Sequence, residues 1–166
     1  MNYKYMRKRG KKLQKNSSAL IAFFLLLLSA FVFPLFGKKM FGEEIGGGTV
    51  MINLIKSVFT SSGNLNSMLG FLQLILVILF CIIILLYFLN GVGSIYNHYS
   101  RYASFLTFVY FIVGLLVYNM LNEKYAESLF GFSLSSISLG SGIYFVPIIG
   151  ICYLLFVKKI NRTIRI

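Results

Sequence analysis

Residues 69–89 read LGFLQLILVILFCIIILLYFL, a stretch that contains no Asp, Glu, Lys or Arg. A helix rises about 1.5 Å per residue, so this stretch is long enough to cross a hydrocarbon core of about 30 Å. Three further stretches, residues 17–36, 103–121 and 138–157, are similarly apolar. The sequence therefore predicts an all-α integral membrane protein with four transmembrane helices.

The composition of the chain supports this class of protein. Hydrophobic residues make up 58% of the chain and the mean hydropathy is +0.82, whereas ordinary soluble domains contain about 45–50% apolar residues. A water-soluble fold of this size has too little interior to bury so much apolar surface. We therefore expect the lipid bilayer to be one partner of the chain.

The basic residues predict the orientation of the chain. There are 16 Lys and Arg against 4 acidic residues, and 11 of the 16 precede residue 17 or follow residue 157. Short segments rich in Lys and Arg stay on the cytoplasmic side of a membrane, so residues 1–16 and 158–166 are predicted to be cytoplasmic tails. Lys38 and Lys39 favour the opposite orientation but are outnumbered. Because orientation accounts for the net charge of +12, we expect no nucleic-acid partner.

The first predicted outer loop contains an amphipathic segment. In residues 49–60, four apolar side chains recur at helical spacing: Met51, Leu54, Ile55 and Val58. This pattern predicts a helix with one apolar face, which lies on the membrane, packs over the mouth of the bundle, or contacts another membrane or extracellular protein. We treat these four residues as candidate partner contacts. The preceding residues 43–48 are expected to form a flexible acidic segment.

The second predicted outer loop mixes apolar residues with serines. We interpret residues 125–137 as an interfacial segment that leads into a fourth span beginning at Ser138. Two pairs of small residues have four-residue spacing, Ser136 with Gly140 and Ser138 with Gly142. On a membrane helix this spacing allows close approach of a second helix, so the four residues are candidates for helix packing within the chain or, alternatively, between subunits.

Residues capable of catalysis or metal binding are scarce. The four Glu all lie in the predicted outer loops, and His98 lies in the short inner loop. Cys81 and Cys152 lie within spans and have no metal-ligand spacing. We therefore expect no catalytic set, cofactor or metal site. The alternative is a membrane-embedded enzyme that acts on lipid-linked substrates through Glu43, Glu44 or His98.

The predicted spans carry few polar side chains and no charge in their central parts. Gln73 and Asn119 are both expected near the outer side. Such residues form hydrogen bonds between membrane helices, or line the pore of an oligomeric channel. Ion-coupled transporters usually place charges inside the membrane, which makes a coupled pump a poor fit to this chain.

The helix count, short tails and long first outer loop resemble the claudin family in outline. The Trp and the paired Cys of that family's first outer loop are absent here. The resemblance therefore implies neither a function nor any site residues for this chain. Eleven Lys against five Arg, the absence of Trp and the heavy use of Ile, Leu, Phe, Asn and Tyr are typical of AT-rich genomes. This composition indicates a low-GC bacterium.

Three classes of function remain open. The favoured one is a non-enzymatic membrane protein that acts through protein contacts, such as an immunity protein or an accessory subunit of a membrane complex. The alternatives are a subunit of a small channel or transporter, and a membrane-embedded enzyme. The sequence leaves the oligomeric state open.

Overall fold

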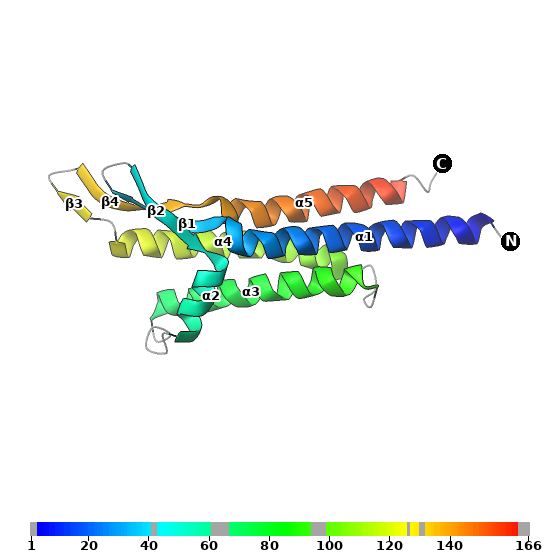
Figure 1. The fold of residues 1–166 in the computed structure, drawn as a ribbon, viewed down its shortest axis with the longest axis horizontal. Coiled ribbons are helices and arrows are strands. Elements are labelled where there is room, and N and C mark those ends of the chain that lie inside the picture. Colours follow the sequence, from blue (N-terminus) through cyan, green and yellow to red (C-terminus); the bar gives the residue numbers. More distant parts are fainter. Residues whose placement is uncertain are drawn as a thin grey trace.

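The computed structural model describes residues 3–40, 43–60, 67–93, 99–125, 127–129 and 132–162. Four long helices lie side by side (Figure 1): α1 (Tyr3–Val32), α3 (Met68–Gly91), α4 (Tyr99–Tyr125) and α5 (Ser141–Arg162). Each contains a segment long and apolar enough to cross a membrane: Leu13–Val32, Met68–Gly91, Arg101–Glu123 and Ser141–Ile160. The prediction of a four-span membrane protein is confirmed.

The four helices form a closed ring. Helix α1 packs against α3 and α5, and α4 packs against the same two helices. Neighbours in the ring run antiparallel, so α1 begins and α5 ends at the same end of the bundle (Figure 1). We call this the terminal end, and the opposite end the cap end.

Burial divides each helix into an inward and an outward face. On α3, Leu76, Phe80 and Ile83 are buried, whereas Ile78 and Leu85 are about half exposed although they are equally apolar. A helix that is apolar all round is typical of a membrane span, because lipid covers the outward face. On α1, small side chains form the inward stripe and allow close packing: Ala19, Ala22, Ser29 and Ala30.

A four-stranded sheet covers the cap end of the bundle. It contains β1 (Pro34–Met40), β2 (Glu43–Val50), β3 (Glu127–Leu129) and β4 (Phe132–Leu139) in the order β2-β1-β4-β3, all antiparallel. The central β1–β4 pair extends from Phe36 opposite Leu139 to Met40 opposite Ser135. It therefore joins two loops that are about a hundred residues apart in sequence. The sheet together with the short helix α2 (Met51–Thr60) is called the cap below.

The sheet corrects four predictions. The first span, predicted to end at residue 36, ends at Val32, because β1 begins at Pro34. Residues 43–48, expected to be flexible, belong to β2, and residues 132–137 of the expected interfacial segment belong to β4. The fourth span begins at Ser141 rather than Ser138, because residues 132–139 pair with β1. Backbone N–H and C=O groups need partners, and for these residues the neighbouring loop supplies them.

The predicted tails are partly helical. Helix α1 begins at Tyr3, so most of the basic segment 1–16 continues the first span as one helix. Helix α5 extends to Arg162, five residues beyond the predicted end of the fourth span. In the same way, α4 begins at Tyr99 and ends at Tyr125, outside the predicted limits 103 and 121.

Candidate functional site

The cap is joined to the bundle where the chain leaves α1 and enters α5. The Gly140 N–H donates a hydrogen bond to the Leu35 carbonyl at 2.8 Å. A Cβ at Gly142 would lie 2.9 Å from the Phe33 carbonyl oxygen, and the rings of Phe33 and Phe145 stack with centroids 4.4 Å apart. The two connections therefore touch through their backbones, which fixes the sheet on the bundle.

A third contact ties the sheet to α4. The Ile137 N–H of β4 donates to the Asn122 Oδ1 in the last turns of α4 at 3.2 Å. In α2 the apolar face packs over the bundle, since α2 contacts both α1 and α3. The cap is therefore anchored by α1, α3, α4 and α5 together.

The predicted helix at residues 49–60 is confirmed as α2, and its apolar face is covered by the chain itself. Met51, Leu54 and Val58 are 1%, 3% and 7% exposed and belong to the hydrophobic core, and Ile55 is half-buried against it. Of the readings left open by the sequence, packing over the bundle mouth applies. Met51, Leu54 and Val58 are therefore covered by the chain's own core, Ile55 remains partly exposed, and the exposed face of α2 carries Asn53, Lys56 and Phe59.

A cavity of about 550 Å³ lies between the sheet, α2 and the cap end of the bundle. This volume is in the range of sites that hold small ligands or protruding side chains, about 300–1,000 Å³. Its polar lining is contributed by the sheet (Lys38 and Thr49), by α2 (Asn53 and Ser57) and by α3 (Gln73). The remaining lining residues are Phe36, Gly37, Gly48, Leu54, Leu121 and Ile137.

The polar side chains that line this cavity can form hydrogen bonds with a bound group. Lys38 supplies an ammonium group, and the amides of Asn53 and Gln73 supply both donors and acceptors. The lining residues named above include no carboxylate, imidazole or thiol. The arrangement suits the recognition of a polar group that accepts hydrogen bonds, such as a peptide carbonyl or a carboxylate.

The two polar span residues singled out in the sequence, Gln73 and Asn119, lie in different surroundings. Gln73 is half-buried and lines the cap cavity, whereas Asn119 is exposed on α4 and does not line it. The buried hydrogen bonds between side chains of different helices lie nearer the terminal end. There the Asn90 Nδ2 donates to the Tyr153 hydroxyl at 2.8 Å, and the hydroxyls of Tyr87 and Ser104 are 3.2 Å apart.

These contacts join α3, α4 and α5 and were missed by sequence reasoning. Asn90 falls just beyond the predicted second span, which ended at residue 89, whereas α3 continues to Gly91. A span extended by one helical turn would have included it. The Tyr87 and Tyr153 rings also meet edge to face, with centroids 5.1 Å apart, so these residues fix the relative position of three helices.

The predicted helix-packing residues lie in a different setting. Ser136 and Ser138 belong to β4, and Gly140 and Gly142 lie at the junction of β4 with α5, so the four-residue spacing is not that of one helix face. Close helix packing occurs elsewhere. A Cβ at Gly150 of α5 would lie 3.1 Å from the Cβ and Cγ2 of Thr107 in α4, and one at Gly114 of α4 would meet the tip of Ile143.

The residues considered for catalysis are dispersed. Glu43 and Glu44 lie in β2, Glu123 is exposed in α4, and Glu127 lies in β3. His98 lies outside the described residues. Cys81 and Cys152 are free thiols on α3 and α5, and no cluster of three metal-binding side chains occurs within the described ranges.

Comparisons with protein families, curated proteins and solved structures find no match to this chain. Its class is therefore defined by its own architecture, a polytopic four-helix membrane bundle whose two loops at one end combine into a small sheet.

Proposed function

We propose that this protein is non-enzymatic and acts through contacts of the cap with another membrane or extracellular protein, as an immunity protein or an accessory subunit does. One observation carries the proposal. Both loops at the cap end are built into a single anchored structure, although the chain needs no such structure merely to connect its spans. A preformed surface of this kind binds a partner without the cost of ordering loops.

Two features of the cap support a protein partner. The exposed face of α2 combines an aromatic ring with polar side chains, since Phe59 is 75% exposed next to Asn53 and Lys56. Exposed aromatic residues beside polar ones are enriched at protein interfaces. The adjacent cavity, with Lys38 and Gln73 in its lining, offers donors for a polar group of the partner.

The edge of the sheet supplies a second means of contact. Strand β2 is the edge strand beside β1, and its centre is Gly46-Gly47-Gly48. Edge strands bind extended segments of other proteins through main-chain hydrogen bonds. Glycine has no side chain that would obstruct the approach of a second strand.

The proposal places the cap outside the cell and both termini in the cytoplasm, following the distribution of Lys and Arg. Reporter fusions at Tyr96 and after Lys159 are expected to report the cytoplasm. Fusions at Gly47 and Glu127 are expected to report the outside. An outside signal at Tyr96 together with a cytoplasmic signal at Gly47 would show that the chain has the opposite orientation.

Site-specific photo-cross-linking in intact cells tests the contact. A photoreactive amino acid at the position of Asn53, Lys56 or Phe59 is expected to give a discrete adduct with a second protein. The same amino acid at the position of Ile112 or Leu155, which are 58% and 60% exposed on the lipid-facing sides of α4 and α5, serves as the matched control. We expect no discrete adduct there.

Absence of an adduct at all three α2 positions would contradict the proposal. Equal labelling of the same protein from the control positions would also contradict it, because contact would then occur along the membrane-spanning surface. Adducts that contain only a second copy of this chain would identify the cap as a dimer surface rather than a site for a different protein.

A further inference from the structure

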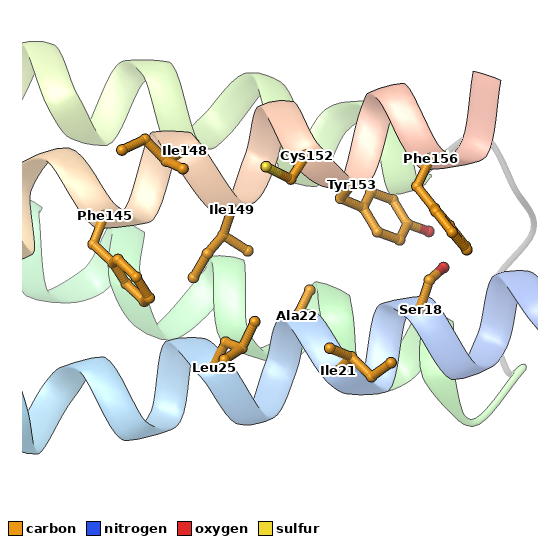
Figure 2. A pocket seen from close by; sticks show the side chains of 10 residues that line it. All are labelled: Ser18, Ile21, Ala22, Leu25, Phe145, Ile148, Ile149, Cys152, Tyr153 and Phe156. Carbon is orange, nitrogen blue, oxygen red and sulfur yellow. The ribbon is translucent and has the colours of Figure 1, made fainter. Parts of the chain in front are cut away.

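A groove of about 360 Å³ runs between α1 and α5 on the side of the bundle (Figure 2). Helix α1 contributes Ser18, Ile21, Ala22 and Leu25, and α5 contributes Phe145, Ile148, Ile149, Cys152, Tyr153 and Phe156. Phe145, Ile149 and Phe156 of α5 point toward α1 across the opening, whereas Ile148 and Cys152 lie on the side of α5 farther from α1 (Figure 2). The small side chains of Ser18 and Ala22 leave the space that larger ones would fill.

The groove lies wholly within the first and fourth candidate spans. Its lining is almost entirely apolar, and several lining residues are exposed, with Ile21 at 60% and Ile148 at 52%. In a bilayer, an apolar opening at this depth adjoins the acyl chains of lipids.

The charges at one end of the groove select the kind of lipid. Ser18 and Phe156 line its end toward the termini. Lys15 precedes Ser18 by three residues and Lys159 follows Phe156 by three, so helical spacing places each lysine one turn beyond the groove on the same face. Arg101 of α4 is near enough to Lys15 for their charges to interact.

The acidic side chains of the chain lie at the opposite end of the bundle. All four Glu belong to β2, to β3 or to the last turn of α4, which are at the cap end. Basic residues at the end of a groove between membrane helices bind anionic lipid headgroups. The positive charge therefore favours an anionic lipid over a zwitterionic one.

We propose that the α1–α5 groove is a binding site for one anionic phospholipid, whose acyl chain lies in the apolar opening between the two helices and whose phosphate is held by Lys15 and Lys159. The site is separate from the cap and independent of the partner contact proposed above.

The natural chain contains no Trp, so single-Trp variants report lipid contact by fluorescence. The groove probe is Phe156→Trp. The matched control is Leu85→Trp, which is exposed to lipid on α3 near the same end of the bundle, on a helix without Lys or Arg. Each full-length variant is reconstituted in phosphatidylcholine vesicles that contain either brominated phosphatidylglycerol or brominated phosphatidylcholine as quencher.

For Phe156→Trp we expect half-maximal quenching at a mole fraction of brominated phosphatidylglycerol about fivefold lower, or more, than that of brominated phosphatidylcholine. The reason is that each lysine near a membrane surface strengthens the binding of an anionic lipid by about this factor. The preference should disappear when Lys15→Gln and Lys159→Gln are added. Leu85→Trp should be quenched equally by both lipids. Circular dichroism confirms that the lysine variants retain their helices.

Three results would overturn the proposal. Equal quenching of Phe156→Trp by the two lipids would show that the groove contacts lipid without any preference for an anionic headgroup. The same preference at Leu85→Trp would show a general effect of surface charge. Quenching of Phe156→Trp by neither lipid would show that a protein segment, from a second copy or another chain, covers the groove.

Discussion

Replacing Gly140 with alanine is expected to destabilise the protein by about 1–3 kcal/mol or more, because the new methyl group has no space. Its Cβ would collide with the Pro34 carbonyl oxygen and lie 2.7 Å from the Pro34 carbonyl carbon and 2.8 Å from that of Leu35. These are backbone atoms of the connection between α1 and β1, so no side-chain rotation relieves the contact. Denaturant unfolding of the purified protein in detergent measures the loss.

Gly114→Ala is the control for this prediction. A Cβ there would lie 2.8 Å from the Cδ1 of Ile143, which is the end of a flexible side chain and can move aside. We therefore expect Gly114→Ala to cost much less than Gly140→Ala. Equal losses would mean that the junction between cap and bundle tolerates separation and does not hold the sheet in place.

Gly150→Leu is expected to force α4 and α5 apart and to prevent stable folding. The Thr107 side chain packs directly on Gly150, and the Thr107 hydroxyl donates to the Ser104 carbonyl at 2.6 Å, which limits its rotation. Overpacking a tight interface typically costs about 1–3 kcal/mol, occasionally more, and a leucine adds four carbons where even one does not fit. Yield of monodisperse protein after membrane extraction, with unfolding of any that remains, measures this effect.

The neighbouring Ile151→Leu variant tests whether the effect is specific to the interface. Ile151 is 41% exposed on the outward face of α5, so an isomeric side chain there should leave stability nearly unchanged. A Gly150→Leu variant as stable as Ile151→Leu would show that α4 and α5 do not approach closely at Thr107.

The spans were predictable because their signal is local. Residues 69–89 contain no charged side chain, and Gln73 is the single amide among them, so no tertiary contact is needed to recognise a stretch of that length. The same holds for α2, whose Met51, Leu54 and Val58 repeat at the period of a helix and are all buried.

The sheet was not predictable because its signal is not local. Strand β1, PLFGKKM, lacks a clear alternation of apolar and polar residues, and β2 contains three consecutive glycines, which are poor strand formers. Their pairing depends on β4, about a hundred residues away. The spacing of Ser136 and Gly140 was ambiguous as well, because residues four apart share a face in a strand as well as in a helix.

The candidate site depends on the sheet and was missed with it. The cap cavity takes Lys38 from β1, Asn53 from α2 and Gln73 from α3, residues that no sequence spacing relates. Periodicity identified the apolar face of α2 correctly, but whether that face meets a partner or the chain's own bundle is decided by tertiary packing.

Central to this account is the pairing of β1 with β4, which makes one cap from two loops. Lys38 and Ile137 are directly opposite in that pair, and opposite residues in antiparallel strands are close enough for a disulfide. With Cys81 and Cys152 changed to Ser, we predict that Lys38→Cys with Ile137→Cys forms a disulfide under mild oxidation, seen as a mobility shift that a reductant reverses.

The matched control is Lys38→Cys with Ser133→Cys, which lies four residues before Ile137 in β4 and is therefore displaced from it by about 13 Å. It should remain reduced under the same conditions. A disulfide in the Lys38–Ile137 variant alone is the result the account predicts; no disulfide in that variant, or equal formation in both, would contradict the pairing of the two loops.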